Sequence, residues 1–169
     1  MNEGLLLMRV VIGLLMAAHG AQKLFGWFGG YGLAGTGQFL EGLGFRPGRF
    51  FAVLASGSEV LGGLLIAFGF LGPIGPALVL SVMIVGAVTV HWANGVFAQN
   101  SGIEVPLLYA TVVTGLALSG PGRYSLDALL GLTSLWTPAV TSVVLLAGIA
   151  GGLGNLALRH VGARQRVVA

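Results

Sequence analysis

Two long stretches of this sequence contain no Lys, Arg, Asp or Glu, and they limit what the chain can fold into. The first lies between Glu59 and Glu104, and the second covers residues 128–158. A helix needs about 20 apolar residues to cross a bilayer, so the first stretch can hold two spans and the second can hold one. Only 8% of the residues are charged, against about 25% in a typical soluble domain. We therefore expect an all-α integral membrane protein.

Clusters of glycine and proline divide the apolar sequence into five predicted spans. They are residues 5–25, 49–70, 77–92, 104–119 and 138–159. The first four predict a compact four-helix transmembrane bundle over residues 1–131. Residues 132–169 add a fifth transmembrane helix and a basic tail with Arg159, Arg164 and Arg166. Between the first two spans we expect a short membrane-surface helix that begins at Thr36.

Polar residues from four of these spans fall in one half of the bilayer, on the side that carries the loop 26–48. Successive spans alternate in direction and each helical residue rises about 1.5 Å, so the depth of each residue can be followed along the chain. The residues on this side are His19, Lys23, Glu59, His91, Trp92 and Glu104. Ionisable groups inside a span are costly and raise the hypothesis of a functional site. We expect these residues to line one pocket.

Each polar residue also has a structural interpretation. Lys23 can extend its charge to the membrane surface, and Glu104 can be an exposed acid at a helix start. Glu59 fits such an interpretation least well, because an ionised carboxylate deep in a span needs a partner. His19 or Lys23 is the expected partner. A carboxylate paired with a basic group suits proton transfer, so Glu59 and His19 are the candidate catalytic residues.

Residue spacing and composition argue against several other kinds of site. His19, Glu59, His91 and Glu104 offer imidazoles and carboxylates, but no paired His or Glu spacing supports them, and no metal site is expected. The chain has no Cys, which excludes covalent c-type haem and Cys-ligated iron–sulfur clusters within it. The positive charges are few and scattered, so no nucleic-acid binding is expected.

The opposite half of the bilayer carries a second polar set, Arg9, Arg123 and Asp127. Asp127 can pair with either arginine and tie the segment 120–127 to the first span, which is a structural latch. The alternative is a site for an anion or a lipid headgroup. The side with the loop 26–48 carries more Lys and Arg, so it is predicted to be cytoplasmic, with the N-terminus outside and the C-terminus inside.

Small residues recur at four-residue spacing on several predicted spans. Gly148 and Gly152 on the fifth span are one example. Such residues let helices approach closely, and packing within the bundle is the favoured interpretation. The alternative is a homo-oligomer that forms through the fifth helix.

Three sequence motifs occur in order along the first four predicted spans. They are Arg9-x3-Gly13-x5-His19-Gly20-x2-Lys23-Leu24-Phe25-Gly26, then Gly57-x-Glu59-x2-Gly62-Gly63, then Gly-Pro-Gly-Arg-Tyr-Ser-Leu-Asp at 120–127. Together they resemble the DoxX family over residues 8–130. The resemblance implies a four-helix membrane core in a bacterial cell (plasma) membrane and a link to redox chemistry. The family is similar to DoxD-type membrane subunits of thiosulfate:quinone oxidoreductase, and mycobacterial relatives are associated with oxidative-stress proteins.

Two functions are open at this stage. The first is a quinone-linked redox membrane protein, a subunit or partner in a thiosulfate- or thiol-related oxidoreductase system. Its pocket would bind a quinone against aromatic residues (Trp27, Phe28, Tyr31 and Trp92), with electrons from a redox partner subunit. His19, Glu59 or His91 would exchange protons, and Lys23 would stabilise an oxyanion. The alternative is a non-enzymatic membrane scaffold or small-molecule carrier that uses the same pocket.

Overall fold

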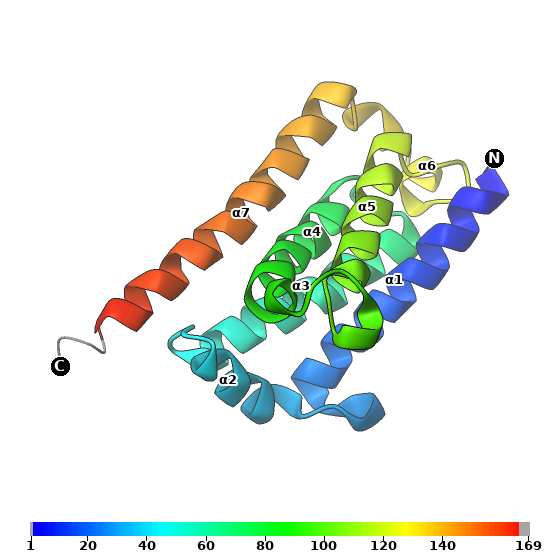
Figure 1. The fold of residues 1–169 in the computed structure, drawn as a ribbon. Helices are drawn as coiled ribbons and strands as arrows, with labels where there is room; N and C mark the ends of the chain where they lie inside the picture. The colour runs from blue at the N-terminus through cyan, green and yellow to red at the C-terminus, as the bar shows by residue number, and fades with distance from the viewer. Residues whose placement is uncertain (1, 166–169) are drawn as a thin grey trace.

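The computed structural model describes the backbone of residues 2–165 and the side chains up to Arg159. All regular structure in this part of the chain is helical (Figure 1). The α-helices are α1 (Asn2–Phe25), α2 (Gly32–Gly42), α3 (Gly48–Phe68), α4 (Ile74–Gly86), α5 (Glu104–Ser119), α6 (Leu126–Leu129) and α7 (Pro138–Gln165). The predicted fold, a helical membrane bundle, is confirmed. Arg166 and the side chain of Arg164, part of the predicted basic tail, lie outside the described residues.

Within residues 2–165, four helical stretches are long and apolar enough to cross a membrane. They are Asn2–Phe25, Gly48–Phe68, Ile74–Asn94 and Pro138–Arg159. The helix α5 is shorter, with 16 residues. At about 1.5 Å per residue it extends for about 24 Å, somewhat less than the roughly 30 Å hydrocarbon core. The first and last described residues lie at opposite ends of the bundle (Figure 1).

The closest helix pair is α1 against α3, and glycines make this approach possible. A Cβ atom on Gly13 would lie 2.5 Å from the backbone oxygen of Gly63, and one on Gly63 would lie 2.5 Å from the backbone nitrogen of Ala17. Gly20 makes a similar close approach further along α1, because a Cβ atom on it would lie 2.7 Å from the backbone oxygen of Ser56. Because the two backbones nearly touch, side chains just beyond Gly20 reach directly into α3.

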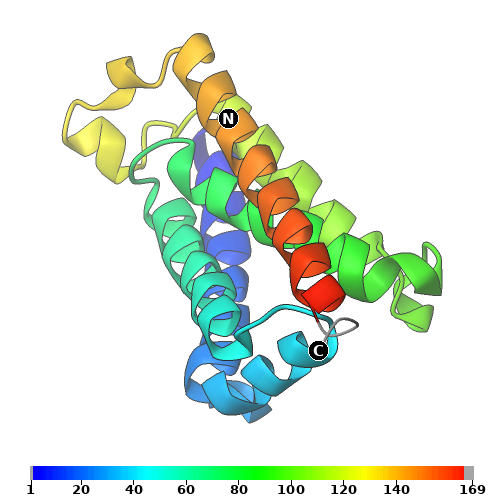
Figure 2. The same cartoon turned by 90° about the vertical axis from the view of Figure 1, so that its left-hand side faces the viewer.

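The helix α7 packs along α4 through its glycine face. A Cβ atom on Gly148 would lie 2.6 Å from the oxygen of Ala77, and one on Gly152 would lie 2.9 Å from the oxygen of Ser81. At its far end the Nε atom of Arg159 donates to the oxygen of Leu43 at 2.5 Å, and α7 reaches the loop after α2 (Figure 2). Gly148 and Gly152 therefore serve packing within the chain, and an oligomer formed through α7 would use its outer face.

The predicted third span is not a uniform α-helix. After α4 the chain forms a π-helical turn, Ala87–His91, and then a 3-10 turn, Trp92–Asn94. A π-helical turn inside a span places one extra residue in the helix and often lies at a functional site. Two residues of the turn, Thr89 and Val90, line the cavity described below.

A short surface helix lies between α1 and α3, as expected, but Thr36 does not begin it. Tyr31 is the residue before the first turn, and Gly32 adopts a φ of +64°. Thr36 lies one turn inside α2 and its hydroxyl donates to the oxygen of Lys23 at 3.3 Å. The hydroxyl thus supplies a hydrogen bond to a carbonyl at the C-terminal end of α1, where the last carbonyls have no N–H donor within the helix.

Candidate functional site

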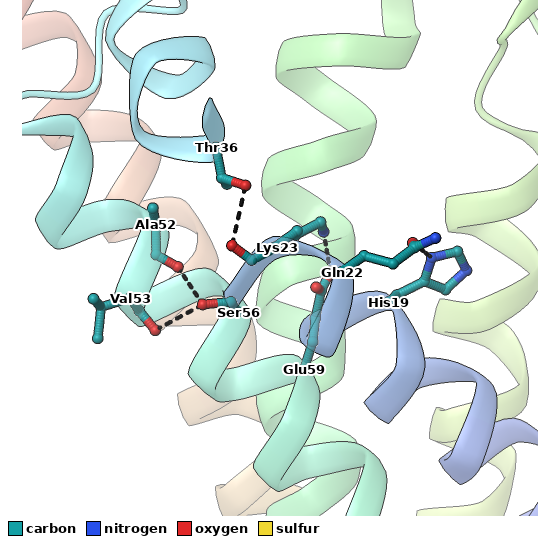
Figure 3. A network of polar contacts seen from close by, with 8 residues as sticks. All are labelled: His19, Gln22, Lys23, Thr36, Ala52, Val53, Ser56 and Glu59. Carbon is teal, nitrogen blue, oxygen red and sulfur yellow. Dashed lines mark hydrogen bonds and ion pairs between the residues drawn. The ribbon is translucent and has the colours of Figure 1, made fainter. Parts of the chain in front are cut away.

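The central contact of the site is an ion pair between α1 and α3. The Nζ atom of Lys23 lies 2.5 Å from Oε1 of Glu59 (Figure 3). The Glu59 side chain is 1% exposed and that of Lys23 is 38% exposed. Lys23 therefore links a buried carboxylate to a more open region, and it is the partner of Glu59 in this structure.

Helix geometry explains why Lys23 makes this contact. The Cα–Cβ bonds of a helix tilt toward its N-terminus, which for α1 points deeper into the membrane. The long lysine side chain can follow that direction back to Glu59, beside the close approach of Gly20 to Ser56. Lys23 lies near the end of α1, where a positive charge is also favoured by the helix dipole.

One carboxylate oxygen of Glu59 is left without a partner. Its Oε2 atom is buried and accepts no hydrogen bond from the described residues. The neighbouring hydroxyl of Ser56 donates to the oxygen of Ala52 at 2.6 Å. A buried polar atom without a partner is unusual and costly, so Oε2 of Glu59 has capacity for a proton.

A cavity of about 320 Å³ lies beside this ion pair. Its walls come from the end of α1, from α2 and the loop after it, from α3, from α4 with the π-helical turn, and from α7. The lining residues are Lys23, Thr36, Phe39, Leu40, Phe45, Phe51, Leu54, Ala55, Ser58, Leu78, Ser81, Val82, Val85, Gly86, Thr89, Val90, Gly151 and Asn155. The volume is in the range of small-molecule sites, and the lining is mostly apolar with a few polar groups, as in such sites.

The cavity is open toward the outside of the bundle. Phe39 on α2 and Leu54 on α3 both line it, and they are 54% and 42% exposed. Leu54 belongs to a membrane-spanning helix, so we expect the open side of the cavity to face lipid. This position suits a molecule that is dissolved in the membrane.

His19 lies near the ion pair but does not contact Glu59. Its Nδ1 atom lies 3.3 Å from Oε1 of Gln22, and its ring packs edge-on against Tyr109 of α5, with centroids 6.1 Å apart. The ring is exposed and points away from Glu59 (Figure 3). His19 is one turn deeper on α1 than Lys23, so its short side chain reaches α5 instead of the carboxylate.

The structure does not bring His91, Trp92 and Glu104 to Glu59 and Lys23. The Nδ1 atom of His91 lies 2.6 Å from the oxygen of Ser101, and Oε2 of Glu104 accepts from the nitrogen of Ala98 at 2.7 Å. These contacts hold the loop between α4 and α5. Their shared half of the bilayer predicted one pocket. Depth in the membrane does not determine which face of a helix a side chain lies on, and these residues lie on faces that contact their own loop.

The aromatic residues expected around a quinone ring also lie elsewhere. Trp27, Phe28 and Tyr31 are 59%, 70% and 88% exposed, and Trp92 is 70% exposed. They are placed as residues of the membrane–water interface usually are. Aromatic lining comes instead from Phe39, Phe45 and Phe51, which the sequence reasoning assigned no role at the site.

On the opposite side, Arg9 and Asp127 form two halves of a latch. The guanidinium of Arg9 donates to the oxygens of Pro121 and Tyr124, and Asp127 accepts from the nitrogens of Leu71 at 2.9 Å and Gly72 at 2.7 Å. Arg9 and Asp127 are 3% and 0% exposed. Contrary to one expectation, Asp127 forms no ion pair with either arginine in the described part of the chain; both buried groups bind backbone atoms. The backbone nitrogen of Arg123 donates to Asn2 at 3.1 Å, and its side chain is exposed.

Within residues 2–159, no three His, Asp or Glu side chains lie close enough together to hold a metal ion. The cavity of about 320 Å³ beside the ion pair is the candidate site for a small organic molecule, because its lining is mostly apolar and includes the charged Lys23.

Comparison with known proteins gives related proteins but no solved structure that matches. The chain is 29% identical over 124 residues to "Putative oxidoreductase CatD" of Bacillus subtilis (strain 168), covering 73% of this chain and 84% of the relative. It is 34% identical over 135 residues to "Inner membrane protein YqjF" of Escherichia coli (strain K12), covering 76% and 93%. The DoxX family model matches residues 4–92, which hold α1, α2, α3, α4 and the Lys23–Glu59 pair. The three motifs, the helical membrane bundle and this match agree that the chain belongs to the DoxX family.

Proposed function

We propose that this protein is a quinone-linked redox membrane protein that binds its quinone in the cavity beside Lys23 and Glu59. Its electrons would come from a partner subunit in a thiosulfate- or thiol-related oxidoreductase system, since the chain has no thiol of its own. The name of the Bacillus subtilis relative supports an oxidoreductase role. Reduction of a quinone to a quinol takes up two electrons and two protons.

The observation that carries the proposal is the unpartnered oxygen of the buried Glu59. A carboxylate with one oxygen on Lys23 and one without a partner can accept and release a proton at Oε2. Lys23 lines the cavity, so its ammonium can hydrogen bond with an oxygen of the ligand and stabilise negative charge there. The apolar walls and the opening toward lipid fit a ring with a hydrocarbon tail.

The first test is extraction and mass spectrometry of the protein purified from its own membranes in a mild detergent. We expect quinone to co-purify with the wild type. It should be depleted in Lys23→Met and retained in the control Glu41→Gln, which changes an exposed acid that binds the nitrogen of Gly48 at 3.0 Å. Absence of quinone from all three preparations would contradict the proposal.

The second test separates binding from turnover. Membranes with Glu59→Gln should bind quinone but reduce it with thiosulfate or a thiol at least about 100-fold more slowly, because the proton-exchanging group is gone. If deletion of the protein leaves these rates unchanged while quinone still co-purifies, the protein is a carrier or scaffold and not an oxidoreductase subunit.

A further inference from the structure

Asn155 is the polar side chain that α7 contributes to the cavity. Among the described side chains of α7, Gly151, one turn earlier, is the other residue in the lining, and it leaves space beside Ser81 of α4. Both α7 residues lie outside the region 4–92 that the family model matches. The α7 wall of the cavity is therefore formed by a part of the chain that the family match does not describe.

The carboxamide of Asn155 has bonding capacity that the protein does not use. Its Nδ2 atom donates to the oxygen of Gly151 at 2.9 Å, and within the described residues Oδ1 accepts no hydrogen bond. A carboxamide offers two donors and one acceptor with two lone pairs. Inside a membrane span such groups are costly unless they find partners. A second N–H and the oxygen remain available on a side chain that lines the cavity.

Packing fixes which face of α7 turns toward the cavity. Gly148 and Gly152 hold one face of α7 against α4, and Arg159 ties the next turn to the oxygen of Leu43. Asn155 lies between these two attachments. Rotation of α7 would break both of them, so Asn155 stays on the face of the helix that lines the cavity.

We propose that Asn155 is a specificity-determining residue, which hydrogen bonds with an oxygen substituent of the cavity ligand. This inference rests on the proposed function, since it assigns a second polar contact to the same ligand. Lys23 on α1 and Asn155 on α7 belong to different walls, so together they select a ring with oxygens at two positions. A purely hydrocarbon molecule would fill the cavity without using either contact.

The test compares two probes and two variants. The probes are 2-decyl-1,4-benzoquinone and decylbenzene, which share a tail but differ in the ring oxygens. The variants are Asn155→Leu and the control Ser142→Leu. Ser142 is also on α7 and also bonds to the oxygen four residues earlier, that of Pro138 at 2.8 Å, but it is exposed and does not line the cavity.

We expect Asn155→Leu to weaken binding of the decylbenzoquinone about fivefold to tenfold, the value of one hydrogen bond, and to leave binding of decylbenzene unchanged. Ser142→Leu should change neither. If wild-type protein binds the quinone and Asn155→Leu binds it equally well, or loses both probes alike, the assignment of Asn155 is wrong while the proposed function stands. If the wild type binds no quinone, the proposed function fails and this inference fails with it.

Discussion

At the scale of single residues, the molecule depends on how two buried acids are neutralised. Glu59 relies on one lysine that is itself 38% exposed, whereas Asp127 relies on two backbone N–H groups. An acid held by backbone groups has a fixed structural role, because its partners cannot leave. An acid held by one mobile side chain can change partners. This difference separates the candidate site around Glu59 from the latch around Asp127.

The two partners of the ion pair should not be equally important for stability. Lys23→Met leaves a carboxylate that is 1% exposed without a counter-ion, and we expect a loss of about 3 kcal/mol. Glu59→Gln leaves an ammonium that can extend to the membrane surface, and should cost about 1 kcal/mol. Thermal unfolding in detergent, followed by circular dichroism, measures both.

The double variant supplies the control for this prediction. Lys23→Met combined with Glu59→Gln removes the unpaired charge, so it should be more stable than Lys23→Met alone. A double variant that loses the sum of the two single effects would show that the pair does not couple.

Arg9 depends on a glycine for its position. A Cβ atom on Gly69 would lie 2.0 Å from the Nη1 atom of Arg9, and Gly69 has a φ of +62°. Gly69→Ala should therefore displace the guanidinium from Pro121 and Tyr124. We expect it to cost about 2 kcal/mol more than Gly131→Ala, which meets only backbone strain because no atom lies within 4 Å at its φ of +71°. Equal unfolding temperatures for the two variants would contradict this role of Gly69.

At this scale the sequence predicted a partner for Glu59 but left His19 and Lys23 open, and in the structure Lys23 makes the contact. Connectivity and rise per residue placed Lys23 and Glu59 in the same half of the bilayer, where a buried carboxylate requires a partner. The same reasoning placed His91 and Glu104 in that half, but these residues have neighbouring loop backbone to bind. A residue near a helix end can satisfy itself locally, whereas Glu59 in mid-span cannot.

At the scale of elements, α7 completes the cavity, and two separate attachments hold it to the rest of the chain. It packs on α4 through Gly148 and Gly152 and reaches the α2–α3 loop through Arg159. The spans themselves were predictable, because an apolar run between turn residues fixes a helix. The π-helical turn Ala87–His91 was not, because its apolar sequence suits an ordinary α-helix equally well.

The packing of α7 can be tested by adding single methyl groups. Gly148→Ala would place a Cβ atom 2.6 Å from the oxygen of Ala77 and should cost about 1–3 kcal/mol by forcing the helices apart. Gly154→Ala is the matched control on the same helix, since no atom lies within 4 Å of its Cβ position. It should be neutral in the same unfolding measurement. If both variants unfold alike, α7 does not pack on α4 as described.

At the scale of the whole molecule, the two ends of the bundle differ in charge and aromatic content. The end with α2 carries Lys23, Arg46, Arg49 and Arg159 in the described part, and the other end carries Arg9 and Arg123. Arg9 is committed to the latch and is 3% exposed, which leaves Arg123 as the exposed cation there. The exposed Trp27, Phe28 and Tyr31 also lie at the α2 end. We expect the end with more cations to be the cytoplasmic one, whereas aromatic residues are common at both membrane surfaces.

This asymmetry predicts the orientation of the protein in the cell membrane. Cations near short loops are retained in the cytoplasm during insertion, so the α2 end should be cytoplasmic, with the N-terminus outside and the C-terminus inside. A green fluorescent protein fused after Ala169 should therefore fluoresce, and alkaline phosphatase fused there should be inactive. The exposed Arg46 and Arg49 should contribute most, because Lys23 is already paired with Glu59. Replacing both arginines with Gln should produce a detectable fraction of active phosphatase, while Arg123→Gln should produce none. Full phosphatase activity in the unmodified chain would reverse the orientation and place the α2 end outside.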